Sequence, residues 1–300
     1  MIIVFGKQGQ LAQAFRSTLP TALKEQVHFV SSQEADFEKP HLLDGFLDHY
    51  GPSIVVVCSA YTLVDKAEED RERAEKINHQ APAAIARWCA INSAKLIMFS
   101  TDYVFSGKGD QPWKESDATA PLNCYGETKV EMEEALRFSG CQYLVFRLSW
   151  VYSEFGKNFV KTMLQLGQSR ELLQVVDDQI GSPTYAPDVA KVIWSLLQKV
   201  LFEKAVWPAS GIYHLTGRGF MSWAEFAKLI FQVARANEEK YDLHIKIQKI
   251  EPVLSSEFPS VAVRPKNSRL SGEKVKQNLG IEMPIVEDSL KVCLQKIYLP

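Results

Sequence analysis

Tyr125 and Lys129 lie four residues apart, a spacing that can produce acid–base chemistry. Residues i and i+4 of an α-helix share one face. A free tyrosine titrates near pH 10, and a neighbouring lysine ammonium stabilises the phenolate and lowers this pKa. The pair therefore predicts a phenol that exchanges a proton near neutral pH. By itself, the spacing favours a simpler interpretation, a half-buried tyrosine beside a solvated lysine.

A second polar group follows the apolar segment 95–99, which has the length of a buried strand. Thr101 and Asp102 come just after it, and the carboxyl ends of parallel strands are where open α/β sheets bind ligands. Thr101 is thus predicted to hydrogen-bond a substrate oxygen beside Tyr125. The alternative is turn chemistry, with Thr101 or Asp102 capping a local loop.

A glycine turn follows the first apolar segment, residues 1–5. Gly6 permits a tight turn, Gly9 allows backbone to approach a pyrophosphate, and Ala12 allows close packing of the following helix. The helix would present free N–H groups to the phosphates. The spacing is G-x-x-G-x-x-A rather than G-x-G-x-x-G, but it stands between a predicted strand and a predicted helix, as a dinucleotide site requires. An ordinary strand-to-helix turn is the alternative.

These three motifs together resemble the extended short-chain dehydrogenase/reductases. A narrower resemblance, to the dTDP-4-dehydrorhamnose reductase family, extends over nearly the whole chain. Its motifs are the segments 64–68, 121–129, 147–152, 178–184 and 264–270.

The resemblance implies a reaction. This is NAD(P)H-dependent reduction of the C4 ketone of dTDP-4-dehydro-6-deoxy-L-mannose (dTDP-4-dehydrorhamnose) to dTDP-L-rhamnose, or reduction of a closely related 4-keto-6-deoxy nucleotide sugar. Tyr125 would protonate the developing alkoxide. Lys129 would lower the pKa of Tyr125 and hold the nicotinamide ribose, while Thr101 would hydrogen-bond the same oxygen or the phenol.

The resemblance also implies the binding residues. Those for the substrate are Thr101, Asp102, Asn123, Trp150 and Arg264, with Lys266 a weaker candidate for the diphosphate. Those for the cofactor, besides Tyr125 and Lys129, are Gly6, Gly9, Gln10, Leu11, Ser31, Asp36, Phe37, Ala60, Tyr61 and Thr62. Trp150 would offer an apolar face to the sugar, although a core aromatic is the alternative.

The choice between NADPH and NADH depends on the end of the second predicted strand. Ser31 and Ser32 stand there, where a carboxylate would bind a ribose 2′-hydroxyl and repel a 2′-phosphate. The absence of that carboxylate favours NADPH, but no arginine follows nearby. The sequence therefore favours NADPH without excluding NADH.

The alternation of strand and helix patterns predicts an α/β fold with a Rossmann-like, doubly wound parallel sheet. Strands are expected at 1–5, 27–30, 54–57, 95–99 and 143–146, with helices at 65–90 and 126–138. Residues 1–150, plus part of about 184–215, form the predicted dinucleotide-binding domain. A smaller, discontinuous C-terminal α/β substrate domain is expected from about 151–183 and 216–300. Further strands are expected at 173–176 and 211–215, and further helices at 187–199 and 222–236, where Ser222 and Glu225 suggest a capping box.

Composition excludes several partners. The chain has 300 residues, 46% of them hydrophobic and 23% charged, with a formal net charge of −2. This composition gives no electrostatic case for nucleic acid, and no apolar segment is long enough to span a bilayer. Five scattered cysteines and the absence of a signal-peptide pattern predict a reducing cytoplasm. A monomer or a homodimer is expected.

No metal site is predicted, because the six histidines show no paired ligand spacing. Some members of the resembled family hold Mg²⁺ at a dimer contact through a glutamate early in the first helix, and Ala14 stands at that position here. Two rival functions remain open. One is an NDP-sugar epimerase or dehydratase, and the other is a non-catalytic subunit resembling the regulatory subunit of methionine adenosyltransferase.

Overall fold

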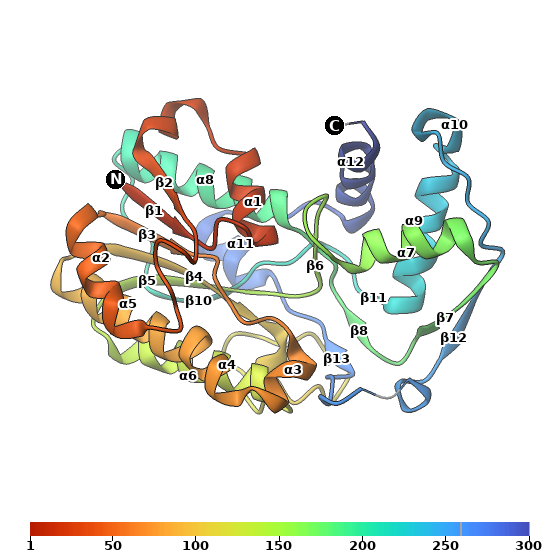
Figure 1. Ribbon diagram of the computed structural model, residues 1–300, viewed down its shortest axis with the longest axis horizontal. Coiled ribbons are helices and arrows are strands. Elements are labelled where there is room, and N and C mark those ends of the chain that lie inside the picture. Colours follow the sequence, from red (N-terminus) through yellow and green to blue (C-terminus); the bar gives the residue numbers. More distant parts are fainter. Residues whose placement is uncertain (259, 300) are drawn as a thin grey trace.

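The computed structural model describes residues 1–258 and 260–299. Its centre is a six-stranded parallel sheet with the strand order β10-β5-β4-β3-β1-β2 (Figure 1). The strands are β1 (Ile2–Phe5), β2 (Val27–Val30), β3 (Ile54–Val57), β4 (Lys95–Thr101), β5 (Gln142–Leu148) and β10 (Gly211–His214). The strand order reverses on either side of β1, which confirms the predicted Rossmann-like, doubly wound sheet.

The sheet is buried on both faces, as the continuous apolar strands require. In β1, Ile2 and Val4 belong to one hydrophobic core, whereas Ile3 and Phe5 belong to another. Alternate residues of a strand point to opposite faces, so one short apolar segment supplies both cores.

Helices cover each face of the sheet (Figure 1). On one face lie α1 (Gln10–Ser17) and α8 (Ala186–Phe202), which pack together partly through the rings of Phe15 and Trp194. On the other face lie α2 (Leu43–Tyr50), α5 (Ala81–Ile91) and α6 (Cys124–Phe138). The helix predicted around Tyr125 and Lys129 is therefore confirmed.

The helical stretch predicted at 65–90 is present but interrupted. The structure divides this stretch into α3 (Val64–Glu69), α4 (Arg71–Glu75), the π-helical turn η3 (Lys76–Gln80) and α5. Asp70 leaves helical geometry, with φ −117° and ψ 49°. The π-turn places the side chain of Asn78 inside the protein, where it is fully buried and hydrogen-bonded. Hydrophobic periodicity carries no signal for either interruption.

A second part of the molecule has its own hydrophobic core. It is built around α7 (Phe159–Ser169), α9 (Trp223–Arg235) and α12 (Val286–Tyr298). Its short strands are β6 (Val151–Tyr152) with β9 (Thr184–Tyr185), β7 (Leu172–Val176) with β12 (Lys249–Val253), and β8 (Ile180–Gly181) between β11 (Met221–Ser222) and β13 (Asn267–Ser268). The predicted capping box of Ser222 and Glu225 opens α9.

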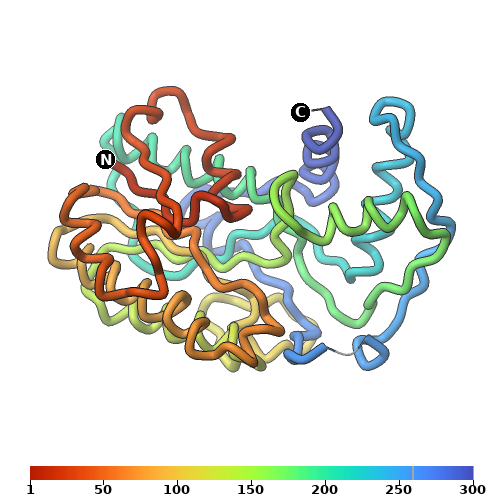
Figure 2. Tube along the Cα trace, viewed as in Figure 1, coloured from red at the N-terminus to blue at the C-terminus, as the bar shows by residue number. Residues whose placement is uncertain are grey.

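The chain passes repeatedly between the two parts, and Figure 2 shows α8 and β10 returning to the sheet after the first segments of the second part. Val275 of α11 (Glu273–Leu279) and Met283 also pack in a core beside the sheet. The predicted second domain at 216–300 therefore includes a segment that contacts the first, and the domain bounds stay a prediction. The remaining short helices are η1 (Thr21–Gln26), η2 (Pro40–Leu42), η4 (Asp102–Val104), α10 (Glu238–Tyr241) and η5 (Ser255–Glu257). None of the helices in the described residues is long and apolar enough to cross a membrane.

Candidate active site

The glycine turn has the geometry that a phosphate-binding loop needs. Gly6 has φ +93°, and a Cβ there would lie 2.8 Å from the backbone nitrogen of Ser59, so both the conformation and the space require glycine. Gly9 is the N-cap of α1 and has no side chain to cap the helix. The N-terminal N–H groups of α1 therefore open onto the adjacent cavity, as an anion site requires.

A cavity of about 960 Å³ runs along the carboxyl ends of the central strands. It brings together residues that are far apart in the sequence and that come from both parts of the molecule. The predicted site residues that line it are Gly6, Gly9, Gln10, Leu11, Asp36, Phe37, Ala60, Thr62, Thr101, Asp102, Tyr125, Lys129 and Trp150. This volume lies at the upper end of the range that is usual for ligand cavities.

Two predicted cofactor residues do not line the cavity. The Ser31 hydroxyl donates a hydrogen bond to Glu34, and Ser32 lines the cavity in its place. The side chain of Tyr61 is buried outside the cavity, and its backbone is held by Asn78.

The predicted substrate residues Asn123 and Arg264 also lie outside the cavity lining. Asn123 is the N-cap of α6, accepting a hydrogen bond from the Gly126 N–H at 2.8 Å. Arg264 pairs with Asp65, with Nη2 and Oδ2 separated by 2.6 Å. These contacts give both residues a structural role. Their predicted roles in binding stay predictions.

The predicted catalytic residues converge at the carboxyl end of β4. Thr101 is the last residue of that strand, and Tyr125 and Lys129 lie on α6. The close approach of α6 depends on Gly126, where a Cβ would lie 2.3 Å from the carbonyl oxygen of Tyr103. The Lys129 ammonium donates a hydrogen bond to the carbonyl oxygen of Phe99 at 2.9 Å.

Burial sets the protonation of this pair in the ligand-free protein. Burial raises the pKa of Tyr125, and a hydrogen bond with Thr101 acts in the opposite direction. Burial also lowers the pKa of Lys129 to about 8, opposed by the negative charge of Glu133. The phenol is therefore held protonated, ready to donate. That Lys129 lowers the pKa of Tyr125 stays a prediction for the complex with ligands.

Asp102 adds a buried carboxyl group to the cavity wall. Its side chain is 2% exposed, and burial raises its pKa to about 6 against hydrogen bonds with Ser268, Thr101 and Ser149. Its Oδ2 atom has no hydrogen-bond partner among the described residues. Buried acceptors are nearly always paired, so this oxygen retains the capacity to accept a further hydrogen bond.

Trp150 occupies a strained position at the same cavity. Its φ is +48°, a left-handed value that is rare for bulky residues. Its ring fills the space beside Gly181, where a Cβ would lie 2.4 Å from the indole. The ring also stacks on Trp223, which lines the cavity and was missed by the sequence analysis. Backbone strain of this kind often accompanies a functional site.

Asn78 is a second residue that sequence analysis missed. Its amide bonds both the N–H and the carbonyl of Tyr61, at 2.8 and 3.1 Å, and reaches the Thr128 hydroxyl at 3.1 Å. Thr128 in turn donates to the carbonyl of Tyr125. Asn78 thus ties the loop after β3 to the helix that carries Tyr125. Because Asn78 stands among other polar residues, at 75–80, its type gave no signal in the sequence.

Two cations in the cavity lining bear on cofactor choice. These are Lys7 and Arg73, which share the lining with Ser32 and Asp36. Arg73 arrives from α4, distant in sequence from β2, which is why no nearby arginine could be found there. Its guanidinium is hydrogen-bonded to Glu38 at 2.9 Å. These cations are compatible with an additional phosphate on the cofactor.

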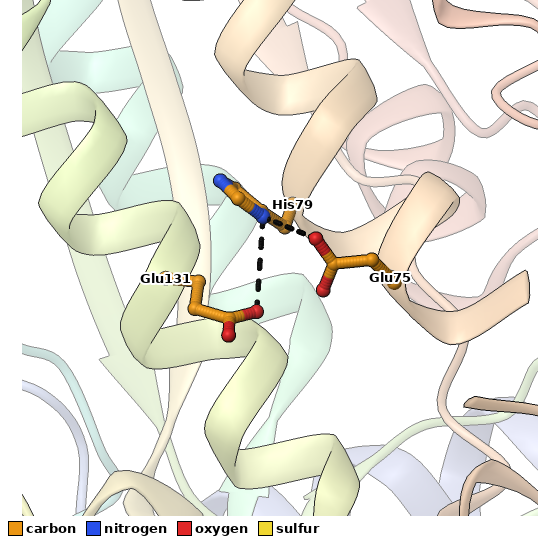
Figure 3. A group of neighbouring side chains, drawn as sticks. All are labelled: Glu75, His79 and Glu131. Atoms are coloured by element: carbon orange, nitrogen blue, oxygen red, sulfur yellow. Dashed lines mark hydrogen bonds and ion pairs between the residues drawn. The ribbon is translucent and has the colours of Figure 1, made fainter. Parts of the chain in front are cut away.

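One group of metal-ligand side chains meets on the outside of the helical layer. Figure 3 shows Glu75, His79 and Glu131 pointing toward one another from neighbouring helices, and their ligand atoms all lie within 4.8 Å. The His79 Nδ1 is 2.6 Å from a Glu75 oxygen. Burial and the adjacent Glu75 raise the pKa of Glu131 to about 7, so a shared proton can relieve the repulsion between the carboxylates. Ala14, the position of the family glutamate, is fully buried in the core. The absence of a metal stays a prediction.

The sheet, its glycine turn and the cavity at the carboxyl ends of the strands define a Rossmann-type α/β protein, and comparisons identify its family. Residues 1–299 match the RmlD substrate binding domain family. The dTDP-4-dehydrorhamnose reductase of Escherichia coli K12 is 38% identical over 299 residues, covering 99% of this chain and 98% of that protein. The chain therefore belongs to this family, which confirms the resemblance found in the sequence.

Solved structures agree with that assignment. A dTDP-4-dehydrorhamnose reductase from Bacillus anthracis, crystallised with NADP, is 33% identical with a TM-score of 0.88, covering 98% of each chain. The Thermus thermophilus UDP-glucose 4-epimerase, in complex with NAD, has a TM-score of 0.77 at 15% identity, covering 99% of this chain and 98% of that one. At 15% identity, the similarity to the epimerase concerns the fold alone. It therefore supports the epimerase alternative less than the Bacillus anthracis structure supports a reductase.

Proposed function

We propose that the protein reduces the C4 ketone of dTDP-4-dehydro-6-deoxy-L-mannose, or of a closely related dTDP-4-keto-6-deoxy sugar, with NADPH or NADH as the reductant. The observation that carries the proposal is the convergence of Thr101, Tyr125 and Lys129 in the cavity that begins at the glycine turn. Family membership over residues 1–299 supplies the substrate class.

The residues present fit a dinucleotide. The left-handed Gly6 and the uncapped N-terminus of α1 suit a pyrophosphate, and Asp36 and Phe37 line the far end of the cavity. When bound, the nicotinamide supplies the hydride for C4. Lys7 and Arg73 favour NADPH over NADH. Lys129 would then hold the ribose next to the nicotinamide.

Tyr125 carries the proton in this mechanism. Its hydroxyl donates to the C4 oxygen as negative charge develops there, and Thr101 hydrogen-bonds the same oxygen or the phenol. The Lys129 ammonium stabilises the phenolate that remains. The unpaired Oδ2 of Asp102 accepts from a sugar hydroxyl, while Trp150 packs against an apolar face of the sugar.

The decisive experiment mixes purified protein with the dTDP-4-keto sugar and either NADPH or NADH. Stoichiometric loss of reduced cofactor, together with formation of a 4-hydroxy dTDP-sugar, supports the proposal. Interconversion of sugars with no net consumption of cofactor would instead indicate an epimerase or dehydratase. Absence of turnover with every nucleotide sugar, combined with capture of a synthetase, would favour the regulatory-subunit alternative.

A cytoplasmic location and a monomeric or homodimeric state belong to the same proposal. Both NADPH and nucleotide sugars are cytoplasmic metabolites, so the reaction suits that compartment. Light scattering of the purified protein, with and without Mg²⁺, distinguishes a monomer from a dimer and shows whether the ion changes the state.

A further inference from the structure

Three charged side chains at the catalytic helix α6 and the neighbouring strand β5 are almost completely buried, and one of them is Lys129 of the catalytic pair. Lys129 and Glu133 are each 3% exposed, and Arg147 is 2% exposed. Lys129 and Glu133 are four residues apart on α6 and so share one face of the helix. Charged side chains are almost never buried so completely unless they are paired.

Arg147 binds the Glu133 carboxylate through two nitrogens of its guanidinium. Its Nε donates to one carboxylate oxygen at 2.8 Å, and its Nη2 donates to the other at 2.6 Å. The guanidinium also lies 4.8 Å from the ring centre of Phe105, and Nη1 is 3.4 Å from His214. This is the bidentate geometry of a strong buried ion pair.

One carboxylate, that of Glu133, binds Arg147 directly and lies one helical turn from Lys129 on α6. Burial and the neighbouring Arg147 hold the pKa of His214 well below its usual range, so this histidine is neutral. Lys129 also lines the cavity, together with Tyr125 and Asp102, and burial raises the pKa of Asp102 to about 6. Glu133 therefore supplies the compensating charge behind Lys129, and Arg147 competes for it.

We propose that Glu133 is a positioning residue that keeps Lys129 protonated, and that Arg147 limits this effect by binding the Glu133 carboxylate. Loss of water around an ammonium favours its neutral form, whereas a nearby carboxylate favours the charged form. The balance of these two effects determines the pH up to which Lys129 carries the charge that stabilises the Tyr125 phenolate. This last step rests on the proposed function.

The proposal predicts that replacing Glu133 and replacing Arg147 shift the pKa of Lys129 in opposite directions, although the two residues form one ion pair. Glu133→Gln removes the carboxylate charge at nearly constant shape, so the pKa of Lys129 falls by about one unit. Arg147→Met removes the competing cation and its repulsion, so the pKa of Lys129 rises by a similar amount. Arg147→Lys keeps the charge and should leave the pKa nearly unchanged. A merely structural ion pair would lower the stability of both variants without separating these midpoints.

The titration of Lys129 can be measured without any substrate. Full-length protein labelled at the ε-carbon of lysine is titrated by NMR, and the Lys129 resonance is assigned by its absence in Lys129→Arg. The proposal is supported if the Lys129 titration midpoint is lowest in Glu133→Gln, intermediate in the native protein and highest in Arg147→Met. Equal midpoints, or the reverse order, overturn it. Circular dichroism shows whether Glu133→Gln folds. If it does not, the Lys129 midpoints of Arg147→Met and Arg147→Lys are compared, and only the first should be raised.

A kinetic arm connects the titration to turnover. The basic limb of kcat/KM for the dTDP-4-keto sugar should move in the same directions, with Glu134→Gln as the matched control because Glu134 is exposed on the same helix. If the basic limb of the pH profile stays in place in both variants, the charge on Lys129 does not control turnover in this pH range. Absence of turnover in the native protein defeats the proposed function alone, since the NMR order of midpoints still tests the role of Glu133.

Discussion

The indole rings of Trp150 and Trp223 lie face to face, with centroids 3.5 Å apart and planes that differ by 6°. Trp150 follows the strand β5 of the central sheet, whereas Trp223 is the first residue of α9 in the second part of the molecule. Phe159 contacts the Trp223 ring as well, with centroids 4.5 Å apart. The cavity wall at these residues is therefore shared between the two parts, and its shape depends on both.

Replacing Trp223 by alanine should weaken sugar binding. An aromatic pair contributes about 0.5–1.5 kcal/mol beyond its buried area, so KM for the dTDP-sugar should rise by up to about tenfold. The KM for NADPH should stay constant if Trp223 packs, like the Trp150 ring on which it stacks, against the sugar as proposed. Steady-state kinetics measures both constants. Trp223→Phe keeps an aromatic face and is the control, and a rise in KM for NADPH alone would contradict the placement.

Tyr125→Phe should remove the proton donor while retaining the ring. The expected fall in kcat is roughly 10²–10⁴-fold, the usual contribution of a general acid. Binding of NADPH, followed by its fluorescence, should change little. Full activity in this variant would exclude Tyr125 as the donor.

Lys129→Met should lower the maximal rate and raise the pH optimum. In the native protein, activity should decline as Lys129 loses its proton near its pKa of about 8. Without the ammonium, that decline disappears and the phenol stays protonated to higher pH. The pH profile of kcat measures this effect, and Lys129→Arg tests whether a fixed positive charge restores the rate. An unchanged optimum in Lys129→Met would show that the lysine has no effect on the titration.

Asp102→Asn should stabilise the ligand-free protein at neutral pH and impair sugar binding. Burial raises the pKa of this carboxyl from 3.8 to about 6. The pKa of Asp102 is higher in the folded protein than in the unfolded chain, so ionisation of this carboxyl lowers the stability of the fold. The loss grows as the pH rises from 3.8 to about 6 and is constant at higher pH. The cost is at most about 3 kcal/mol.

The melting temperatures of native protein and Asp102→Asn should therefore differ at pH 8 and converge at pH 4. A difference that does not depend on pH would indicate that packing, rather than ionisation, separates the two proteins. A KM for the dTDP-sugar equal to the native value would exclude Asp102 from substrate binding.

Local patterns predicted the sheet and the catalytic helix because each depends on residues close in sequence. The strand β1 and its glycine turn need only an apolar run followed by Gly6 and Gly9. The spacing of Tyr125 and Lys129 likewise has meaning on any helix. The capping box of Ser222 and Glu225 is equally local. Each of these features is therefore visible without knowledge of the tertiary structure.

Other features depend on contacts across long sequence separations. Arg264 reads as a phosphate ligand from its type, but the structure pairs it with Asp65, 199 residues away. Trp223 looks like the buried start of an amphipathic helix until the fold brings it onto Trp150. The π-helical turn within the helical stretch predicted at 65–90 contains Asn78, whose buried partners lie 17 and 50 residues away. No periodic pattern contains these relationships.

The position of β10 at the edge of the sheet has a consequence for synthesis of the chain. This strand pairs with β5, yet residues 149–210 separate them, and part of that segment builds the second core. On a ribosome, five strands emerge while their edge at β5 is still uncovered. An exposed parallel edge is a template for wrong pairing, and non-local strand pairing is slow. Nascent chains that stop before residue 211 should therefore depend on chaperones more than the completed protein does.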